Sequence, residues 1–124
     1  MRKILKTILK ILTKRAIQRY KPLVIGITGT AGKTTTKEAI FTILSGKFRA
    51  RKNKLNFNNE IGVPMAVLGL DSQTKIGWII NILKSLWLDF GFKQKKYPAI
   101  LVLELAADKP KDISYLVDMV KPTI

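Results

Sequence analysis

A glycine-rich turn constrains this chain more than any other feature of its sequence. Residues 25–36 read IGITGTAGKTTT, and the apolar run of residues 23–27 that enters the turn predicts a short buried strand. A helical pattern begins at Lys33. Glycines between a strand and a helix let several backbone N–H groups converge on one anion, at the positive end of the helix dipole. The stretch therefore predicts a strand–turn–helix unit that binds phosphate.

The match to the general phosphate-loop pattern is partial. That pattern has a glycine at position 27, where this chain has Ile27, and Gly26 comes one residue early. The shorter motif of residues 29–35, GTAGKTT, is therefore the basis for predicting a nucleotide site. In it Lys33 would bring a charge to the outer phosphates, and the Thr34 hydroxyl would hold magnesium. The predicted phosphate-binding residues are Gly29, Thr30, Ala31, Gly32, Lys33, Thr34 and Thr35.

Composition narrows the class of protein. The 124 residues, 47% of them hydrophobic, suit one modest globular domain. With no cysteine and no histidine, disulfides and a zinc site are not expected. A net charge of +15 favours anionic partners such as a nucleotide, a nucleic acid or an acidic lipid surface. Aromatic residues are not interleaved with the basic clusters, so we expect no specific nucleic-acid binding.

Residues 1–20 predict a basic amphipathic helix, which Pro22 ends. Three alternatives are open for it: it lies on an anionic membrane surface, it is an ordinary helix that docks on a missing domain or folds against the sheet, or it is a signal peptide. Lysines interrupt every apolar run and no small-residue cleavage site follows, so the signal peptide is the least favoured. The membrane and docked alternatives stay equal. The apolar face consists of Leu5, Ile8, Leu9, Leu12 and Ala16.

The remaining pattern predicts an alternation of helices and strands. A helix over 33–45 would bury Ala39, Ile40, Ile43 and Leu44, with Gly46 at its end. Further along we expect a short strand at 48–50, a loop at 53–64, helices at 65–70 and 75–91, a strand at 99–105, a helix at 113–120, and a turn that enters another strand at 121–124.

Glu104 is the anomaly of the apolar strand at 99–105. A buried carboxylate is costly unless it is paired or binds a metal. It could point into solvent at the end of the strand. Alternatively, it could lie at the carboxyl edge of the sheet beside the phosphate loop, where open α/β sheets bind ligands. We favour the second interpretation, in which Thr34 and Glu104 share a magnesium ion.

Three separated motifs together resemble the Mur ligase family. Residues 29–38, GTAGKTTTKE, are similar to the family's ATP-binding loop, which lacks the first general glycine. Residues 56–64, NFNNEIGVP, look like the asparagine-rich loop of the branch that adds D-alanyl-D-alanine. Residues 102–105, VLEL, resemble the strand that ends in a magnesium-binding glutamate.

The resemblance implies an α/β fold for residues 22–124: a partial three-layer P-loop-type domain with a mainly parallel sheet. The basic amphipathic helix that the spacing predicts, residues 1–21, precedes it. It implies an ATP-dependent ligase of peptidoglycan precursor synthesis, which adds D-alanyl-D-alanine to a UDP-muramoyl peptide through an acyl phosphate, with ATP and Mg²⁺ as cofactors. The expected location is cytoplasmic, with the inner face of the membrane as the alternative. Lys33 would be catalytic, Thr34 and Glu104 would bind the metal, and Asn56, Asn58 and Asn59 would bind substrate.

The sequence also departs from the family. Ala106 replaces a glycine, and a downstream histidine, a carbamoylated lysine and the flanking domains have no counterpart. We therefore expect a truncated central domain with little or no turnover alone. Two other hypotheses stay open: another phosphate-loop protein such as a small kinase, and a basic module that binds membranes or nucleic acid.

Overall fold

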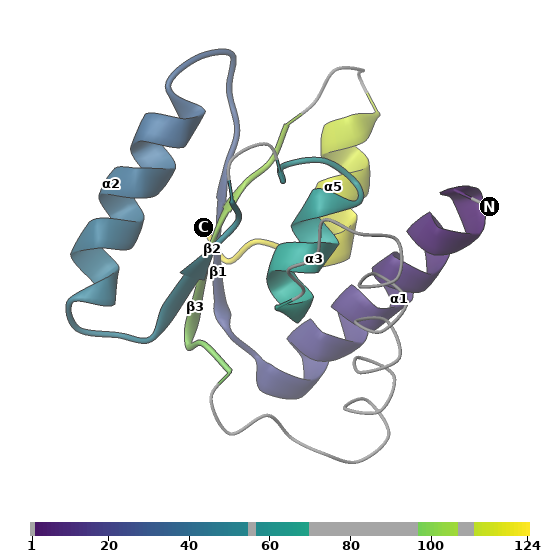
Figure 1. Cartoon of the computed structure of the whole chain (residues 1–124), viewed down its shortest axis with the longest axis horizontal. Helices are drawn as coiled ribbons and strands as arrows, with labels where there is room; N and C mark the ends of the chain where they lie inside the picture. Colours follow the sequence, from purple (N-terminus) through teal and green to yellow (C-terminus); the bar gives the residue numbers. More distant parts are fainter. Residues whose placement is uncertain (1, 55–56, 70–96, 107–110) are drawn as a thin grey trace.

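A computed structural model describes residues 2–54, 57–69, 97–106 and 111–124. The chain forms three layers, in which helix α2 covers one face of a small sheet and α3 and α5 cover the other (Figure 1). This architecture confirms the predicted α/β fold with an N-terminal helix. The expected helix at 75–91 lies outside the described residues. The elements in chain order are α1 (Arg2–Tyr20), β1 (Leu23–Ile27), α2 (Lys33–Ser45), β2 (Ala50–Lys52), α3 (Gly62–Leu68), β3 (Ile100–Glu104) and α5 (Asp112–Val120).

The sheet is parallel, and β3 is its central strand. The strand order is β1-β3-β2, with Leu23 opposite Ile100 and Ala50 also paired with Ile100. All five residues of β3 are buried, as expected for a strand with helices on both faces. The register ends with Ile27 opposite Glu104, so the last residue of β3 lies beside the start of the glycine-rich turn.

The last residues of the chain extend the sheet beyond β1. The N–H of Ile124 donates to the Val24 carbonyl (3.2 Å), and the Gly26 N–H donates to the Ile124 carbonyl (2.9 Å), which is a parallel pairing. A side chain at Gly26 would meet Pro122, with a Cβ–Cγ distance of 3.0 Å. The predicted turn into another strand at 121–124 agrees with this arrangement.

Most of the hydrophobic core lies between the sheet and α1, α3 and α5. It contains the fully buried side chains of Leu101 and Leu103 on β3 and of Leu116 and Met119 on α5. A smaller apolar cluster under α2 consists of Ile27, Ile100 and Val102, with Ile40 and Leu44 packed against it. The α2 side of the sheet therefore has less apolar contact, and polar side chains take part in its packing.

The prediction of the buried face of α2 is wrong for two of its four residues. Ala39 is exposed, and Ile43 has an exposed fraction of 75%, whereas Ile40 and Leu44 are half-buried. The face toward the sheet instead follows Lys37, Ile40 and Leu44, at the spacing of three and four residues that one helix face requires. Lys37 is buried. It was not expected on the buried face because that face was predicted from hydrophobic residues alone.

Several element boundaries differ from those expected. Strand β2 is Ala50–Lys52, not 48–50, because the Phe48 N–H is bound to the Leu44 carbonyl (2.8 Å) and closes α2. Helix α3 begins at Gly62, earlier than position 65, because the Asn59 side chain caps its first amides. Helix α2 ends at Ser45 as predicted, and the following Gly46 is right-handed. Helix α5 begins one residue before the expected position 113.

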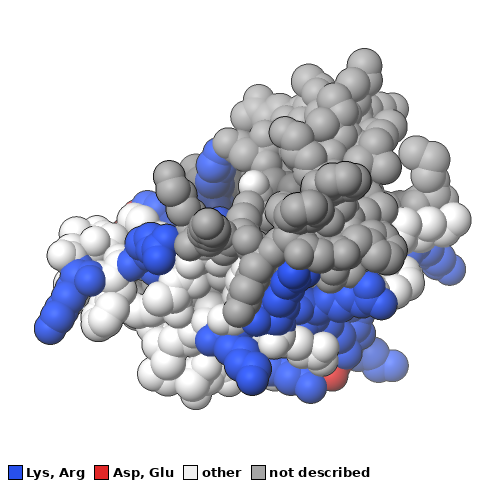
Figure 2. Space-filling model, turned by 90° about the horizontal axis from the view of Figure 1, so that it is seen from below, with Lys and Arg blue, Asp and Glu red and all other residues white. Residues whose placement is uncertain are grey.

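Helix α1 docks on α3 and α5. Leu9, Leu12 and Ala16 are buried there, and this confirms the docked alternative for the apolar face. The same packing does not support the membrane alternative, because the centre of the apolar face is already buried and Leu5 and Ile8 are half-buried. Among the described helices, none combines the length and the apolar character that crossing a membrane demands. Figure 2 shows that lysine and arginine dominate the charged surface of one side of the molecule.

Asp118 on α5 links the basic side of α1 to the domain. Its carboxylate lies 3.2 Å from the Lys10 ammonium and 3.1 Å from that of Lys14. The ammonium groups of Lys6 and Lys10 lie 4.4 Å from the centre of the Tyr115 ring. Hydrogen bonds from Lys14 and then Lys10 lower the pKa of Asp118. Lysines that could have faced anionic lipid therefore pair within the chain.

We predict that Asp118→Asn lowers stability at neutral pH and has no effect in acid. Folding lowers the pKa of the Asp118 carboxyl, so the ionised group stabilises the protein at pH values above its ordinary pKa of 3.8. This stabilisation is lost as the pH falls through the pKa of the folded state. Urea unfolding from pH 7 to pH 2.5 should therefore show a gap between wild type and variant that closes in acid. A gap independent of pH would contradict the ion-pair assignment.

Candidate functional site

The glycine-rich turn forms an open cradle between β1 and α2. Gly29 and Gly32 have φ angles of +143° and +76°, which side chains with a Cβ rarely adopt. Gly32 is the N-cap residue of α2, and no side chain caps this end of the helix. The amides of the first helical turn therefore face the same space as the turn, which suits an anion. Residues 28–32 are all exposed.

Lys33 reaches back over the turn. Its ammonium donates to the Gly29 carbonyl over 2.6 Å, so the positive charge lies above the backbone that would surround a phosphate group. Thr34 is half-buried and turns toward the sheet, whereas Thr35 is exposed. The structure thus brings all seven predicted phosphate-binding residues to one turn and the helical turn that follows it.

Glu104 lies next to this turn and is buried, with an exposed fraction of 4%. One carboxylate oxygen, Oε2, accepts a hydrogen bond from the Thr34 hydroxyl (3.1 Å), and the other, Oε1, accepts one from the Asn58 amide (3.3 Å). The Lys37 ammonium is 3.5 Å from Oε2. The alternative in which Glu104 points into solvent is therefore wrong, and the two predicted metal ligands are in contact.

Lys37 and Asn53 belong to the site, although the sequence did not single them out. The Lys37 side chain is 1% exposed, and its ammonium donates to the Asn53 carbonyl over 2.9 Å. The Asn53 amide pairs twice with the backbone of Glu104, accepting from its N–H (2.9 Å) and donating to its carbonyl (2.8 Å). Two signals were available: Lys37 follows Lys33 by one helical turn, and Asn53 directly follows β2.

The asparagine-rich loop is fixed to the end of β3. Asn58 contacts Glu104 through its side chain and accepts the Ala106 N–H on its carbonyl (2.9 Å). The Asn59 side chain accepts from the amides of Ile61 (3.2 Å) and Gly62 (2.8 Å), and so it starts α3. Asn56 lies outside the described residues. A substrate-binding role for these asparagines stays a prediction.

The geometry of Thr34 and Glu104 fits a magnesium ion. Neighbouring ligands of an octahedral ion with bonds of 2.0–2.1 Å are about 3 Å apart, and Oγ1 of Thr34 lies 3.1 Å from Oε2 of Glu104. Within the described ranges, no three acidic, histidine or cysteine side chains gather into a metal-binding group. Two protein oxygens completed by phosphate oxygens and water match the way magnesium is held beside nucleotides.

Glu38 is an acid near the site that is not part of it. Its carboxylate pairs with the Lys52 ammonium of β2 and lies 3.9 Å from that of Lys37. The hydrogen bond from Lys52 is the main cause that lowers the pKa of Glu38. Its side chain is 46% exposed, so Glu38 forms an ion pair at the rim between α2 and β2.

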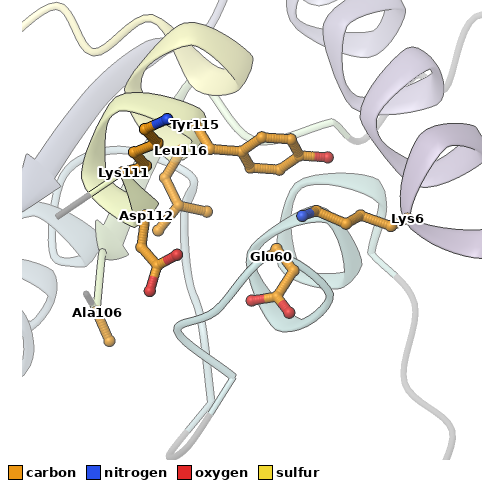
Figure 3. Close-up of a pocket in the computed structure, with 7 residues that line it drawn as sticks. All are labelled: Lys6, Glu60, Ala106, Lys111, Asp112, Tyr115 and Leu116. Atoms are coloured by element: carbon orange, nitrogen blue, oxygen red, sulfur yellow. The ribbon is translucent and has the colours of Figure 1, made fainter. Parts of the chain in front are cut away.

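A separate hollow of about 260 Å³ lies on the opposite side of the sheet from α2. Lys6 of α1, Glu60, and Asp112 and Tyr115 of α5 surround it (Figure 3). Burial raises the pKa of the Tyr115 phenol. Ala106, just after β3, also lines the hollow. The hollow therefore neighbours the end of β3 without including Glu104 or the glycine-rich turn.

Comparison with known proteins points to one family. The Mur ligase middle domain matches residues 27–80. The UDP-N-acetylmuramoyl-tripeptide–D-alanyl-D-alanine ligase of Bacillus subtilis is 44% identical over 70 residues, which are 56% of this chain and 15% of that protein. The ligase of the same name from Synechocystis is 36% identical over 107 residues, 86% of this chain and 18% of that protein.

Solved structures agree with these relatives. MurF from Acinetobacter baumannii superposes with a TM-score of 0.66 at 30% identity, over 92% of this chain and 20% of that one. MurF ligase from Thermotoga maritima in complex with ADP gives a TM-score of 0.66 at 29% identity, over 95% of this chain and 22% of that one. The chain thus spans about a fifth of the length of these proteins.

We predict that Asn53→Ala destabilises the protein by about 3 kcal/mol, because it leaves the buried N–H and carbonyl of Glu104 without partners. Asn59→Ala is the matched control, and it should cost only about 1 kcal/mol through loss of a helix cap. Urea unfolding monitored by circular dichroism measures both. Equal losses in the two variants would show that the Asn53 amide does not hold the end of β3.

Proposed function

The chain belongs to the Mur ligase family, and we propose that it provides the nucleotide- and magnesium-binding part of a ligase that adds D-alanyl-D-alanine to a UDP-muramoyl peptide. The contact between Thr34 and Glu104 is the observation that best supports this proposal. It joins the glycine-rich turn to the end of the central strand over 3.1 Å, as a site for a nucleotide and its metal requires. The region involved would be residues 22–124, with residues 1–21 as a docked helix.

ATP is the nucleotide that we propose for the cradle. The related T. maritima enzyme was solved with ADP. In this chain, the amides at the start of α2 and the Lys33 ammonium would bind the outer phosphates, since both carry positive charge at the mouth of the turn. Lys33 would have to leave the Gly29 carbonyl, which it contacts over 2.6 Å. A hydrogen bond from the Lys33 ammonium to a charged phosphate is stronger than one to a neutral carbonyl, and this difference favours phosphate binding.

Thr34 and Glu104 are the residues that we propose as magnesium ligands. A bound magnesium ion would neutralise negative charge on the outer phosphates. The Thr34 hydroxyl, which now donates its proton to Oε2 of Glu104, would rotate so that a lone pair of Oγ1 faces the ion instead. Asn58 holds the other oxygen, Oε1, so the carboxylate keeps its orientation during this exchange. Such support of a metal ligand by a neighbouring amide is typical of protein metal sites.

The proposed reaction forms an amide bond in two steps. A carboxylate oxygen of the UDP-muramoyl peptide attacks the γ-phosphorus, the bond to the β-phosphate oxygen breaks, and ADP leaves. The amine of D-alanyl-D-alanine then attacks the acyl carbon, the carbon–oxygen bond breaks, and the released phosphate takes up the proton that the amine loses. Lys33 and the α2 amides act by stabilising charge on the transferring phosphoryl group. We place Asn56, Asn58 and Asn59 beside the muramoyl peptide.

Lys33→Ala tests the nucleotide site. Loss of one charged phosphate contact should weaken binding of Mg²⁺–ATP about 10- to 100-fold, as measured by titration calorimetry. Lys47→Ala is the matched control, because Lys47 is an exposed lysine beyond the other end of α2. Equal affinity of the Lys33 variant and wild type would contradict the assignment of the loop.

Glu104→Gln tests the metal site. The change removes the charge of a proposed ligand, so the Mg²⁺ concentration needed for half-maximal ATP binding should rise about tenfold or more. Glu38→Gln serves as the control, since Glu38 contacts Lys37 but not Thr34. An unchanged magnesium requirement in the Glu104 variant would remove Glu104 from the site.

A further inference from the structure

Lys37 is a buried cation that the proposed reaction does not use. Its side chain is 1% exposed, and it enters the sheet face of α2 one helical turn after Lys33. Burying an ammonium group is unfavourable unless charged or polar partners compensate it. Its partners are the Asn53 carbonyl at 2.9 Å, the Glu104 carboxylate at 3.5 Å and, at the rim, the Glu38 carboxylate at 3.9 Å. The position of this charge therefore needs a reason beyond packing.

Glu104, in turn, requires a cation close to its carboxylate. It is buried, and a carboxylate there needs a nearby positive charge whether or not a metal is bound. Lys33 does not supply it, since its ammonium is bound to the Gly29 carbonyl. Among the described residues, Lys37 forms the ion pair with Glu104, on the same oxygen that Thr34 contacts.

We propose that Lys37 is a built-in counter-ion for Glu104 that restricts the site to magnesium arriving with a nucleotide. Without ligand, the ammonium balances the buried carboxylate and keeps the site folded. The same charge repels a divalent cation placed against Oε2, so free Mg²⁺ binds weakly. The phosphates of a nucleotide bring the negative charge that offsets this repulsion. The inference rests on the proposed function, because it takes Glu104 as a magnesium ligand.

The orientation of the side chains supports a charge effect over a steric one. Thr34 and Asn58 already hold both oxygens of Glu104, and Asn53 holds its backbone. Lys37 is farther from the carboxylate than from the Asn53 carbonyl, 3.5 Å against 2.9 Å. It therefore acts on Glu104 through its charge, which persists over such distances in a buried site.

Lys37→Met tests the proposal, because it keeps the length of the side chain and removes the charge. In the absence of metal, the thermal midpoint should fall by about 10 °C, since the variant leaves a buried carboxylate without its partner. Addition of 10 mM MgCl₂ alone should then raise the midpoint by about 5 °C in the variant and by less than about 1 °C in wild type, where the affinity for the free ion is low.

Two further variants test whether the response to MgCl₂ depends on Glu104. In Lys37→Met combined with Glu104→Gln, the midpoint without metal should be higher than in the single Lys37 variant, and MgCl₂ should have no effect. Glu38→Gln should keep the wild-type response to MgCl₂. Glu38 also lies 3.9 Å from the Lys37 ammonium, but its side chain is 46% exposed and pairs with Lys52 at the rim, so water screens its charge. A Lys37 variant as stable as wild type would overturn the proposal, as would equal responses to MgCl₂. Failure of both Lys37 variants to fold would assign Lys37 to packing and overturn it too.

ATP with MgCl₂ separates this inference from the proposed function. Wild type should be stabilised by the two together and not by MgCl₂ alone. If ATP with MgCl₂ has no effect on wild type, the proposed nucleotide site fails. If it stabilises wild type but the Lys37 variant responds to free Mg²⁺ as wild type does, the nucleotide site stands and the counter-ion role of Lys37 is refuted.

Discussion

A carboxylate buried at the end of the central strand is the constraint around which this structure is arranged. Glu104 is 4% exposed in a strand that is otherwise apolar. Three side chains compensate it: Thr34 and Lys37 of α2, and Asn58 of the asparagine-rich loop. Asn53, directly after β2, holds the backbone of Glu104. A carboxylate in this setting is stable only with all its partners in place. The polar site and the fold therefore depend on each other.

Parallel pairing explains why these segments meet. The carboxyl ends of parallel strands lie at one edge of a sheet, and the register places Ile27, the last residue before the glycine-rich turn, opposite Glu104. On the other side, β2 pairs with β3 as far as Lys52, and the side chain of Asn53 continues the pairing to the backbone of Glu104. The loop after β1 and the loop after β2 are thereby held against the same carboxylate.

Much of this arrangement could be predicted from the sequence. The apolar runs gave β1 and β3, the glycines gave the turn, and a charged residue in an apolar strand identified Glu104. Lys37 was missed because hydrophobic periodicity assigns a lysine to the exposed side of a helix, whereas here an ion pair overrides that preference. The same error placed Ile43 in the core, although it is 75% exposed. The start of α3 was missed because it depends on the Asn59 cap and on close packing of Gly62 against Phe57.

A crystal structure of this chain with Mg²⁺ and a non-hydrolysable ATP analogue tests the shared role of Thr34 and Glu104 most directly. We expect one ion in contact with Oγ1 of Thr34 at about 2.1 Å, with Glu104 bound to it directly or through one water, and the outer phosphates on the amides of α2. An analogue bound elsewhere, or an ion remote from Glu104, would contradict it.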